Sequence, residues 1–547
     1  MNVEQSPCAS VNQTPDWDQI DWFRCEREVR RLQARIVKAT QERNWGRVKS
    51  LQWLLTHSFS GKALAVNRVT ENKGKNTPGV DGAIWSTPKV KMKGLGSLRR
   101  RGYQPMPLRR VYIPKSNGKL RPLSIPCMID RAQQALHLLA LEPVAETMGD
   151  PNSYGFRKGR STADAIEQTW KTLNKRVSPQ WILEADIKSC FDKISFEWML
   201  ENIPTDTQVL SKWLRCGFME RGTWLPTTEG TPQGAIISPT AANVVLDGLE
   251  TLLEKRFPRT WRHGVRRSPM VNFIRYADDF VVTGSSKELL ENEVLPVIEG
   301  FLKERGLELS REKTKITHIS VGFDFLGQHL RKHGETLLVT PSKKNKSAFY
   351  QKVREILFKS GDLTQAELIM LLNPVLRGWA NYHRHISASR AFSSMDRIIW
   401  YALVRWARRR HPEASAGWIA SKYWRYIDGR SVFATVSRTR DETPITYRLI
   451  SLAQTRIRRH IKVRGNANPF DPDWNRYFEE RAAFKCRPAL QQENHNSVVN
   501  TGVAPGHTSY WLEPDAGKPA RPVPRGGDRR NPVPLPKRKK KGNYALA

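Results

Sequence analysis

Residues 271–284 read VNFIRYADDFVVTG, in which two adjacent aspartates interrupt two runs of β-forming residues. The runs predict two strands, and the interruption predicts a tight hairpin with Asp278 and Asp279 at its tip. Neighbouring carboxylates in apolar surroundings tend to take up a proton unless a cation compensates their charge. Mg²⁺, which prefers oxygen ligands, could supply that charge. An isolated Asp-Asp pair is nevertheless more often a solvated turn.

A third aspartate favours a shared site over a solvated turn. Residues 181–185, WILEA, predict a buried strand, and Asp186 follows at its end, where it could join the hairpin pair. Three such carboxylates suit two metal ions that activate a 3′-hydroxyl and stabilise a departing pyrophosphate oxygen. The pattern therefore favours nucleotide polymerisation. Alone, Asp186 would be interpreted as a salt-bridged or capping acid, which is our interpretation of Glu184 and Asp192.

The charge of the whole chain indicates a polyanionic partner. Its 547 residues carry 90 Lys plus Arg against 53 Asp plus Glu, a surplus of 37 positive charges, which favours nucleic acid. There is no apolar run of about eighteen residues and no signal segment, so we expect no membrane partner and a cytoplasmic protein. The six cysteines include no Cys-x-x-Cys pair, which argues against a cysteine-rich zinc module.

The length of the chain predicts two to four domains. Periodicity and composition divide it into the following segments. Residues 1–85 contain apolar positions at helical spacing with Lys and Arg between them, a basic helical N-terminal extension. Residues 86–340 mix strand and helix signals and predict an α+β fold, whereas helical spacing dominates residues 341–430. Residues 431–484 form a further segment, and residues 485–547 have the basic, Pro- and Gly-rich composition of a disordered tail.

Two local elements are specific enough to predict. Residues 109–126, RRVYIPKSNGKLRPLSIP, predict two strands joined at Ser-Asn-Gly, a basic hairpin that brings Lys115 and Arg121 together. A helix is predicted over about residues 129–147.

The ordered motifs resemble the reverse transcriptase-maturases encoded by bacterial group II introns. The resemblance covers roughly residues 60–485. It implies a right-hand polymerase, with fingers and an antiparallel palm sheet at 86–340, an all-α thumb or maturase domain at 341–430, and at 431–484 a DNA-binding segment that is the remnant of an endonuclease lead-in. The matching blocks are IPKSNGKLRPLSIP, DRAQQALHLLALEP, SYGFRKGRST, the Asp186 strand, GTPQGAIISPTAANVVLDGLE, YADD, GLELSREKTKI, FDFLGQHL, LLNPVLRGWANYHRH and GNANPFDPDWNRYFEER.

Carried over to the matching positions, the resemblance implies the residues of a polymerase site. Some of the residues named below have a second interpretation. This is ordinary core packing for Phe191, a general RNA-facing surface for the cations of the basic hairpin, and a solvated basic loop for residues 157–160. The implied catalytic metal ligands are Asp186, Asp278 and Asp279, with the carbonyl of Ile187. The implied nucleotide-binding residues are Lys115, Arg121, Phe191, Gln233 and Lys313. The implied primer or template contacts are Tyr276, Arg157, Lys158 and Arg160.

The helical segment carries a second candidate surface. Aromatic rings can stack on unpaired bases while guanidinium groups neutralise phosphates. By sequence pattern alone, such a stripe is more often helix core. The resemblance instead implies a thumb that grips the primer-template duplex and holds intron RNA. The candidate residues are Arg377, Trp379, Tyr382, His383 and Arg384.

The implied function is an RNA-directed DNA polymerase that also binds its intron RNA to assist splicing, and that supports intron mobility by target-primed reverse transcription. The implied cofactor is two Mg²⁺ ions, with Mn²⁺ as a substitute. The implied partners are intron RNA, an RNA template with a DNA primer, target DNA and deoxynucleoside triphosphates. Two alternatives remain open: a splicing chaperone without polymerase activity, and a reverse transcriptase of a defence or diversity-generating system.

Many relatives end in a zinc-containing His-Asn-His nuclease with cysteine pairs. After Cys216 this sequence has only Cys486, and His495 and His507 lack the required spacing. We therefore expect no endonuclease, and we expect another primer, such as a strand at a replication fork, to serve target insertion.

Overall fold

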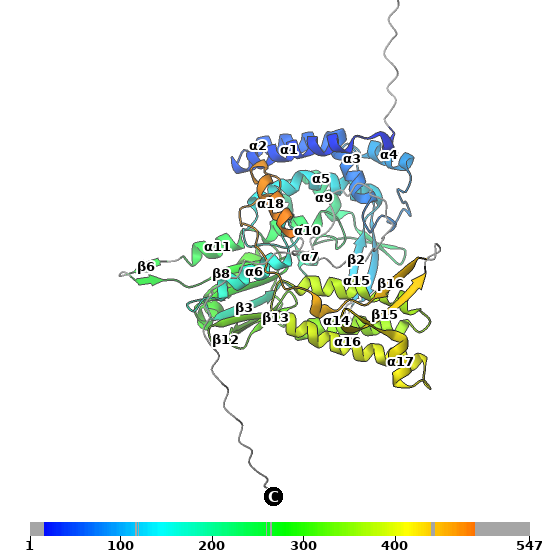
Figure 1. Ribbon diagram of the computed structural model, residues 1–547. Helices are drawn as coiled ribbons and strands as arrows, with labels where there is room; N and C mark the ends of the chain where they lie inside the picture. The colour runs from blue at the N-terminus through cyan, green and yellow to red at the C-terminus, as the bar shows by residue number, and fades with distance from the viewer. Residues whose placement is uncertain are drawn as a thin grey trace, which may run out of the picture.

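The computed structural model describes residues 16–486, apart from residues 115–117, 119, 259, 263–264 and 439–442. Lys115 and residues 487–547 of the expected tail therefore lie outside the described residues. The described elements form a mixed α+β palm, with fingers on one side of it and a largely helical thumb on another (Figure 1).

The palm is a four-stranded antiparallel sheet with the strand order β10-β3-β9-β8. Successive side chains of a strand point to opposite faces, so Val281 packs into one core while Phe280 and Val282 pack into another. Both faces are covered, which explains the continuous apolar runs in residues 271–284. The strands are the two predicted hairpin strands, β8 (Asn272–Tyr276) and β9 (Asp279–Gly284), the predicted β3 (Trp181–Asp186), and β10 (Lys315–His318).

Helices cover the palm sheet on both faces. Ala165 and Ile166 of α6 belong to the core that contains Val281, whereas Val245 of α10 and Ile298 of α13 belong to the other. The palm helices are α6 (Thr162–Leu173), α7 (Cys190–Lys193), α8 (Phe196–Asn202), α9 (Thr207–Arg215), α10 (Ser238–Leu246), α11 (Leu249–Arg256), α12 (Lys287–Leu289), the π-helix η2 (Leu290–Val294) and α13 (Leu295–Lys303). A short hairpin, β6 (Thr260–Arg262) and β7 (Val265–Arg267), follows α11.

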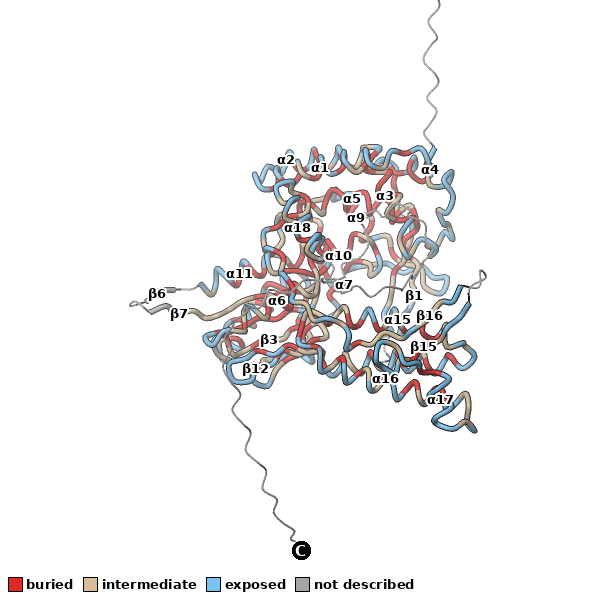
Figure 2. The backbone as a smooth tube through the Cα atoms, in the orientation of Figure 1, coloured by how far each residue is buried: buried red, intermediate tan, exposed pale blue. Residues whose placement is uncertain are grey.

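The fingers combine a small sheet with a helical layer. The predicted basic hairpin forms β1 and β2, and the sheet order is β2-β1-β4-β5. The predicted helix near residue 129 is α5, whose buried length Figure 2 shows beneath the N-terminal helices. None of the described helices is long and apolar enough to span a bilayer. The elements are η1 (Trp17–Gln19), α1 (Trp22–Gln41), α2 (Trp45–His57), α3 (Phe59–Thr70), α4 (Pro88–Ser97), β1 (Leu108–Pro114), β2 (Leu120–Ile125), α5 (Met128–Met148), β4 (Phe218–Glu220) and β5 (Thr223–Leu225).

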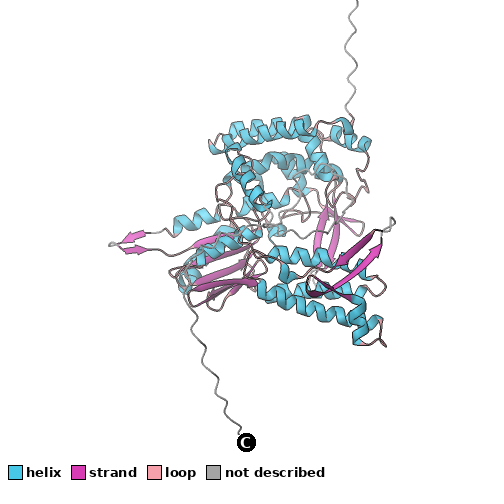
Figure 3. Cartoon of the chain, in the orientation of Figure 1, coloured by secondary structure: helices cyan, strands magenta, loops and turns pink. Residues whose placement is uncertain are grey.

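The thumb follows a three-stranded sheet that shares the core of its helices. Four helices form the expected helical domain, but they are followed by a second three-stranded sheet, β14-β15-β16, that the sequence pattern did not predict (Figure 3). The elements are β11 (Phe323–Phe325), β12 (Gln328–His333), β13 (Thr336–Pro341), α14 (Lys343–Lys359), α15 (Gln365–His383), α16 (Ser389–Arg410), α17 (Ala416–Tyr423), β14 (Trp424–Ile427), β15 (Arg430–Arg438) and β16 (Pro444–Arg448).

Residues 456–484, here called the C-terminal strap, return from the thumb to the palm. One oxygen of the buried Asp164, at the start of α6, accepts hydrogen bonds from His460 Nε2 (2.5 Å), the Val463 amide (2.7 Å) and Arg481 Nη2 (2.8 Å). The strap is therefore built into the palm. The remaining elements are η3 (Leu452–Gln454), η4 (Pro472–Trp474) and α18 (Asn475–Cys486), which lies beside the fingers helices in Figure 1.

Candidate active site

The palm sheet brings the three predicted aspartates together. Asp186, the last residue of β3, pairs directly across the ladder with Asp279, the first residue of β9. Tyr276 also pairs with Asp279, which leaves Ala277 and Asp278 as a two-residue turn. Directly opposed residues have Cβ atoms about 5 Å apart, and the Asp186 carboxyl is close enough to help raise the pKa of Asp279. Residues far apart in the chain thus form one acidic site at a sheet end.

The acidic site holds more negative charge than its surroundings accommodate. Removal from bulk water, and next the charges of Asp278 and Asp186, raise the pKa of Asp279 to about 7. Burial also raises the pKa of Asp278. Lys313 offsets part of this charge, because its Nζ donates to Asp186 Oδ2 at 2.6 Å, and this hydrogen bond raises the pKa of Lys313.

The donors fit a divalent ion in an open site. Among the described residues, no three His, Cys, Asp or Glu side chains close around one point to form a metal cluster. Mg²⁺ usually takes only one or two protein carboxylates and completes its shell with water and phosphate oxygens. The pKa values of Asp278 and Asp279 are raised first by burial and then by the neighbouring carboxylates, and a bound cation would favour the ionised form of both groups.

The main-chain hydrogen bonds around Ile187 determine whether its carbonyl oxygen is available as a metal ligand, the role predicted for it. An isolated antiparallel bridge joins Ile187 to Leu309. Its two hydrogen bonds use the Asp186 carbonyl, which accepts from Ser310, and the Lys188 amide, which donates to Glu308. The Ile187 carbonyl takes no part in this bridge, so its use as a metal ligand stays a prediction that the geometry permits.

A hydrogen-bonded chain connects the fingers hairpin to the palm. Arg121 Nε, on β2, donates to Gln233 Oε1 at 2.9 Å, and Gln233 Nε2 donates to both carboxylate oxygens of Asp192 at 3.1 Å. Gly234 has a φ of +112°, which suits glycine and lets the turn approach Ser124. Asp192 therefore orients a predicted nucleotide-binding residue through hydrogen bonds, and its interpretation from sequence as a salt-bridged or capping acid stays a prediction.

Two predicted aromatic contacts lie next to this site. Phe191 is partly buried against the palm core and meets Phe156 edge-on at 6.4 Å. Tyr276 is partly buried against the core shared by palm and thumb. Their predicted roles toward the sugar and the primer stay predictions.

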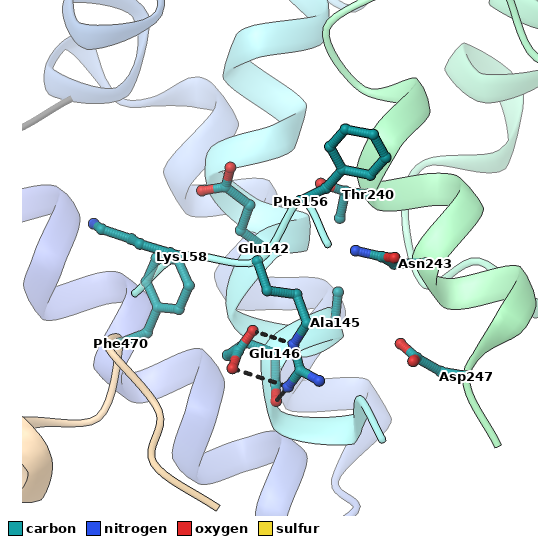
Figure 4. Close-up of a pocket in the computed structure, with 10 residues that line it drawn as sticks. Glu142, Ala145, Glu146, Phe156, Lys158, Thr240, Asn243, Asp247 and Phe470 are labelled. Carbon is teal, nitrogen blue, oxygen red and sulfur yellow. Dashed lines mark hydrogen bonds and ion pairs between the residues drawn. The ribbon is translucent and has the colours of Figure 1, made fainter. Parts of the chain in front are cut away.

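The basic loop after Ser153 differs from its sequence interpretation. Arg157 and Arg160 are buried, and both form ion pairs with the buried Glu146 of α5. This burial contradicts the prediction that these two arginines contact the template, because their guanidinium groups point into the protein. Figure 4 shows Glu146 paired in a pocket that the buried Phe470 and the exposed Lys158 also line. Lys158 stays a predicted template contact.

Two of the candidate rings on α15, Trp379 and His383, are buried in the core, which was the alternative interpretation. Trp379 stacks on Phe349 at 4.3 Å, and Asn345 Oδ1 accepts from Trp379 Nε1 at 2.7 Å and contacts His383 Nε2 at 2.9 Å. Tyr382 donates to the Leu326 carbonyl at 2.9 Å. The prediction that Trp379 and His383 stack on RNA bases is therefore wrong, because both are buried and hold α15 against α14. Tyr382 is half-buried, so its role toward RNA stays a prediction.

The two arginines of that segment differ in exposure. Arg377 is exposed on α15. Arg384 is partly buried, donates to Asn381 Oδ1 at 3.3 Å, and accepts from the Arg458 amide through its carbonyl. Arg377 thus remains a candidate RNA contact, whereas Arg384 has a clear structural role.

The sequence interpretation missed an exposed stripe on α16. Its members recur at three- or four-residue spacing, which places them on one face of the helix, and the stripe contains no acid. That spacing was the signal that could have identified it. The residues of this α16 stripe are Arg390, Ser394, Arg397, Tyr401, Arg405 and Arg408.

Comparison with known proteins adds three family matches. The family "Reverse transcriptase (RNA-dependent DNA polymerase)" matches residues 113–330. The "N-terminal domain of reverse transcriptase" matches residues 17–98, and the "Group II intron, maturase-specific domain" matches residues 346–424.

Three curated relatives were compared over long alignments. Protein YkfC of Escherichia coli (strain K12) is 34% identical over 322 residues, 51% of this chain and 84% of that protein. Group II intron-encoded protein LtrA of Lactococcus lactis subsp. cremoris is 27% identical over 447 residues, 64% of this chain and 72% of that protein. An uncharacterized 91 kDa protein in the cob intron of Schizosaccharomyces pombe is 26% identical over 404 residues, 59% and 49% of the respective chains.

Proposed function

Because this chain belongs to the family of group II intron-encoded reverse transcriptases and maturases, we propose that Asp186, Asp278 and Asp279 form its catalytic site for RNA-templated DNA synthesis. The observation that carries the proposal is the direct cross-strand pairing of Asp186 with Asp279 beside the Asp278 turn. Its excess negative charge gives the family's divalent metal a reason to bind there.

We propose that these aspartates, with the Ile187 carbonyl, hold two Mg²⁺ ions, for which Mn²⁺ can substitute. Such ions lower the pKa of a primer 3′-hydroxyl and stabilise the leaving pyrophosphate. Lys313 neutralises Asp186 in the structure described here. A metal ion bound to that carboxylate would leave Lys313 free to contact the triphosphate, which agrees with its predicted nucleotide contact.

Substrate positioning falls to the Arg121–Gln233–Asp192 chain. Both carboxylate oxygens of Asp192 accept from the Gln233 amide nitrogen, so the Gln233 carbonyl oxygen faces Arg121. This fixes the guanidinium of an exposed residue, which can bind phosphate oxygens with its remaining N–H groups. Phe191 lies in the same region, and a rigid ring beside the sugar would disfavour a 2′-hydroxyl.

For the intron RNA we propose a surface on the thumb. Because Trp379 and His383 are buried and the Tyr382 hydroxyl is used by the Leu326 carbonyl, the groups we assign to RNA are Arg377 and the α16 stripe. Arginine and tyrosine at helical spacing combine phosphate neutralisation with base stacking. Binding there would assist splicing by holding the folded RNA, while the RNA supplies the splicing chemistry.

Primer extension on an RNA template with a DNA primer tests the proposal. Asp278→Ala should abolish extension at every Mg²⁺ or Mn²⁺ concentration and leave intron RNA affinity unchanged, because Asp278 lies in the palm and the α16 stripe in the thumb. Asp324→Ala is the matched control, because that aspartate is exposed and pairs only with His329 among the ion pairs found. Extension that survives Asp278→Ala would disprove the metal assignment.

A further inference from the structure

Arg275 is a buried cation directly behind the catalytic turn. It is 1% exposed and is the next-to-last residue of β8. Its Nη2 donates to Asp247 Oδ1 at 2.5 Å, and its Nη1 donates to Asn243 Oδ1 at 3.1 Å and to the carbonyl oxygen of Ala277 at 3.3 Å. The guanidinium thus connects the palm interior to the residue that precedes Asp278.

The partners of Arg275 are themselves fixed to the palm. Asn243 lies on α10, and Asp247 is the residue that ends this helix. Asn243 Nδ2 also donates to the Gly155 carbonyl at 2.8 Å. A Cβ on Gly155 would lie 2.3 Å from the Ala277 amide nitrogen, so the loop that contains Gly155 touches the turn itself. Asn243 and Arg275 therefore hold both sides of this contact.

The turn needs such support because Ala277 is in an unfavourable conformation. Its φ is +58°, in the left-handed region, where a residue with a Cβ atom is strained. Strain of this kind persists only where the surrounding structure imposes it. The hydrogen bond from Arg275 to the Ala277 carbonyl acts on the peptide that joins Ala277 to Asp278, and it therefore constrains the direction of the Asp278 side chain.

We propose that Arg275 is a positioning residue for catalysis: held by Asp247 and Asn243, it fixes the left-handed turn at Ala277 and so aims Asp278 at the metal site. The inference rests on the proposed polymerase function. The competing view is that Arg275 is only a core ion pair that stabilises the palm. The two views differ in what they predict for the metal requirement of a folded variant.

The test is primer extension by the full chain over a Mg²⁺ titration, with the melting temperature measured on the same preparations. Arg275→Lys keeps the charge but loses the planar fork that reaches three acceptors. We expect the half-saturating Mg²⁺ concentration to rise at least fivefold and kcat to fall about tenfold, with KM for the primer-template unchanged. Asp247→Asn, which keeps an acceptor and removes the charge that orients Arg275, should produce a smaller shift in the same direction.

Arg131→Lys is the matched control. Arg131 is also buried and also donates to backbone carbonyls, of Pro126, Gly74 and Thr77, but these belong to the fingers. The control should lose thermal stability without a change in the half-saturating Mg²⁺ concentration.

A rescue experiment separates positioning from packing. Glycine adopts a positive φ without strain, so Arg275→Lys should reduce kcat less when residue 277 is glycine. We expect the fold-loss of kcat, measured between Ala277→Gly alone and the double variant, to be at least threefold smaller than the loss that Arg275→Lys causes in the unmodified chain. An unchanged Mg²⁺ requirement in Arg275→Lys, or no recovery with glycine, would overturn the proposal. If Arg275→Lys does not fold, the Asp247→Asn titration decides by the same criterion. Failure of the unmodified chain to extend a primer would instead refute the proposed function.

Discussion

Protons and metal should compete for the acidic site. The pKa of Asp279 is raised to about 7, so its carboxyl is mostly protonated below neutral pH, and a metal must displace that proton. At one unit below this pKa about one tenth of the carboxyl is ionised, so the apparent Mn²⁺ affinity at about pH 6 should be roughly tenfold weaker than its alkaline plateau. Asp279→Asn removes the titrating group, so it should lower the plateau affinity and flatten the pH dependence.

Titration calorimetry of the substrate-free chain with Mn²⁺ measures this effect. Runs at neutral pH in buffers of different ionisation enthalpy should show about half a proton released per metal bound by the unmodified chain, and much less by Asp279→Asn. Asp324→Ala serves again as the control carboxylate. Equal Mn²⁺ affinity of the unmodified chain from about pH 5.5 to 8 would refute the reasoning.

The same pKa shift has a consequence for stability, whose sign follows from linkage. The folded chain retains a proton on Asp279 that the unfolded chain releases at lower pH, so the free energy of unfolding should fall as pH rises from the ordinary aspartate value of 3.8 to about 7. Because Asp279 is exposed, solvent screening reduces this effect to about 1–2 kcal/mol at most. Asp279→Asn should therefore be more stable than the unmodified chain at alkaline pH and nearly equal to it in acid.

Four further predictions concern the parts around the site. Glu146→Ala leaves two buried guanidinium groups without their carboxylate and should cost about 3–5 kcal/mol in urea unfolding, whereas Glu146→Gln should cost less. Trp379→Ala should destabilise the thumb by about 3–5 kcal/mol and leave the RNA affinity of the folded fraction unchanged, as measured by filter binding. The double variant Arg397→Ala, Arg405→Ala should weaken intron RNA binding without a change in melting temperature. The slope of log affinity against log salt concentration should become shallower by the amount expected for the loss of about two phosphate contacts. Asp164→Ala should release the C-terminal strap, which limited proteolysis would detect as new cleavage within residues 456–484.

The sequence predicted elements whose signals are local. Strand β3, the β8–β9 hairpin, the β1–β2 hairpin and helix α5 each have an apolar period or turn signal within a few residues. The convergence of Asp186 with Asp279 depended on a non-local pairing, for which the family resemblance supplied the expectation and the β3–β9 register the geometry.

The sequence interpretation failed where it could not identify the residue inside the protein that a side chain contacts. Arg157 was expected to contact the template because its sequence block resembles that of the family, but Glu146 on α5, eleven residues earlier, pairs with it in the protein interior. Trp379 was expected to stack on bases, but Phe349 and Asn345 on α14 occupy its ring and its N–H group. A periodic aromatic or basic pattern does not reveal which face of a helix another element covers.

The strap contact at Asp164 also constrains the order of events during protein synthesis. Three of the hydrogen bonds to this buried carboxylate come from residues 296, 299 and 317 positions later in the chain. A nascent chain that has emerged only as far as the thumb would therefore bury an uncompensated anion or leave α6 undocked. The palm should reach its native state only after the ribosome has released Arg481, the last of these partners, so we expect no RNA copying by a nascent chain before translation has passed that residue.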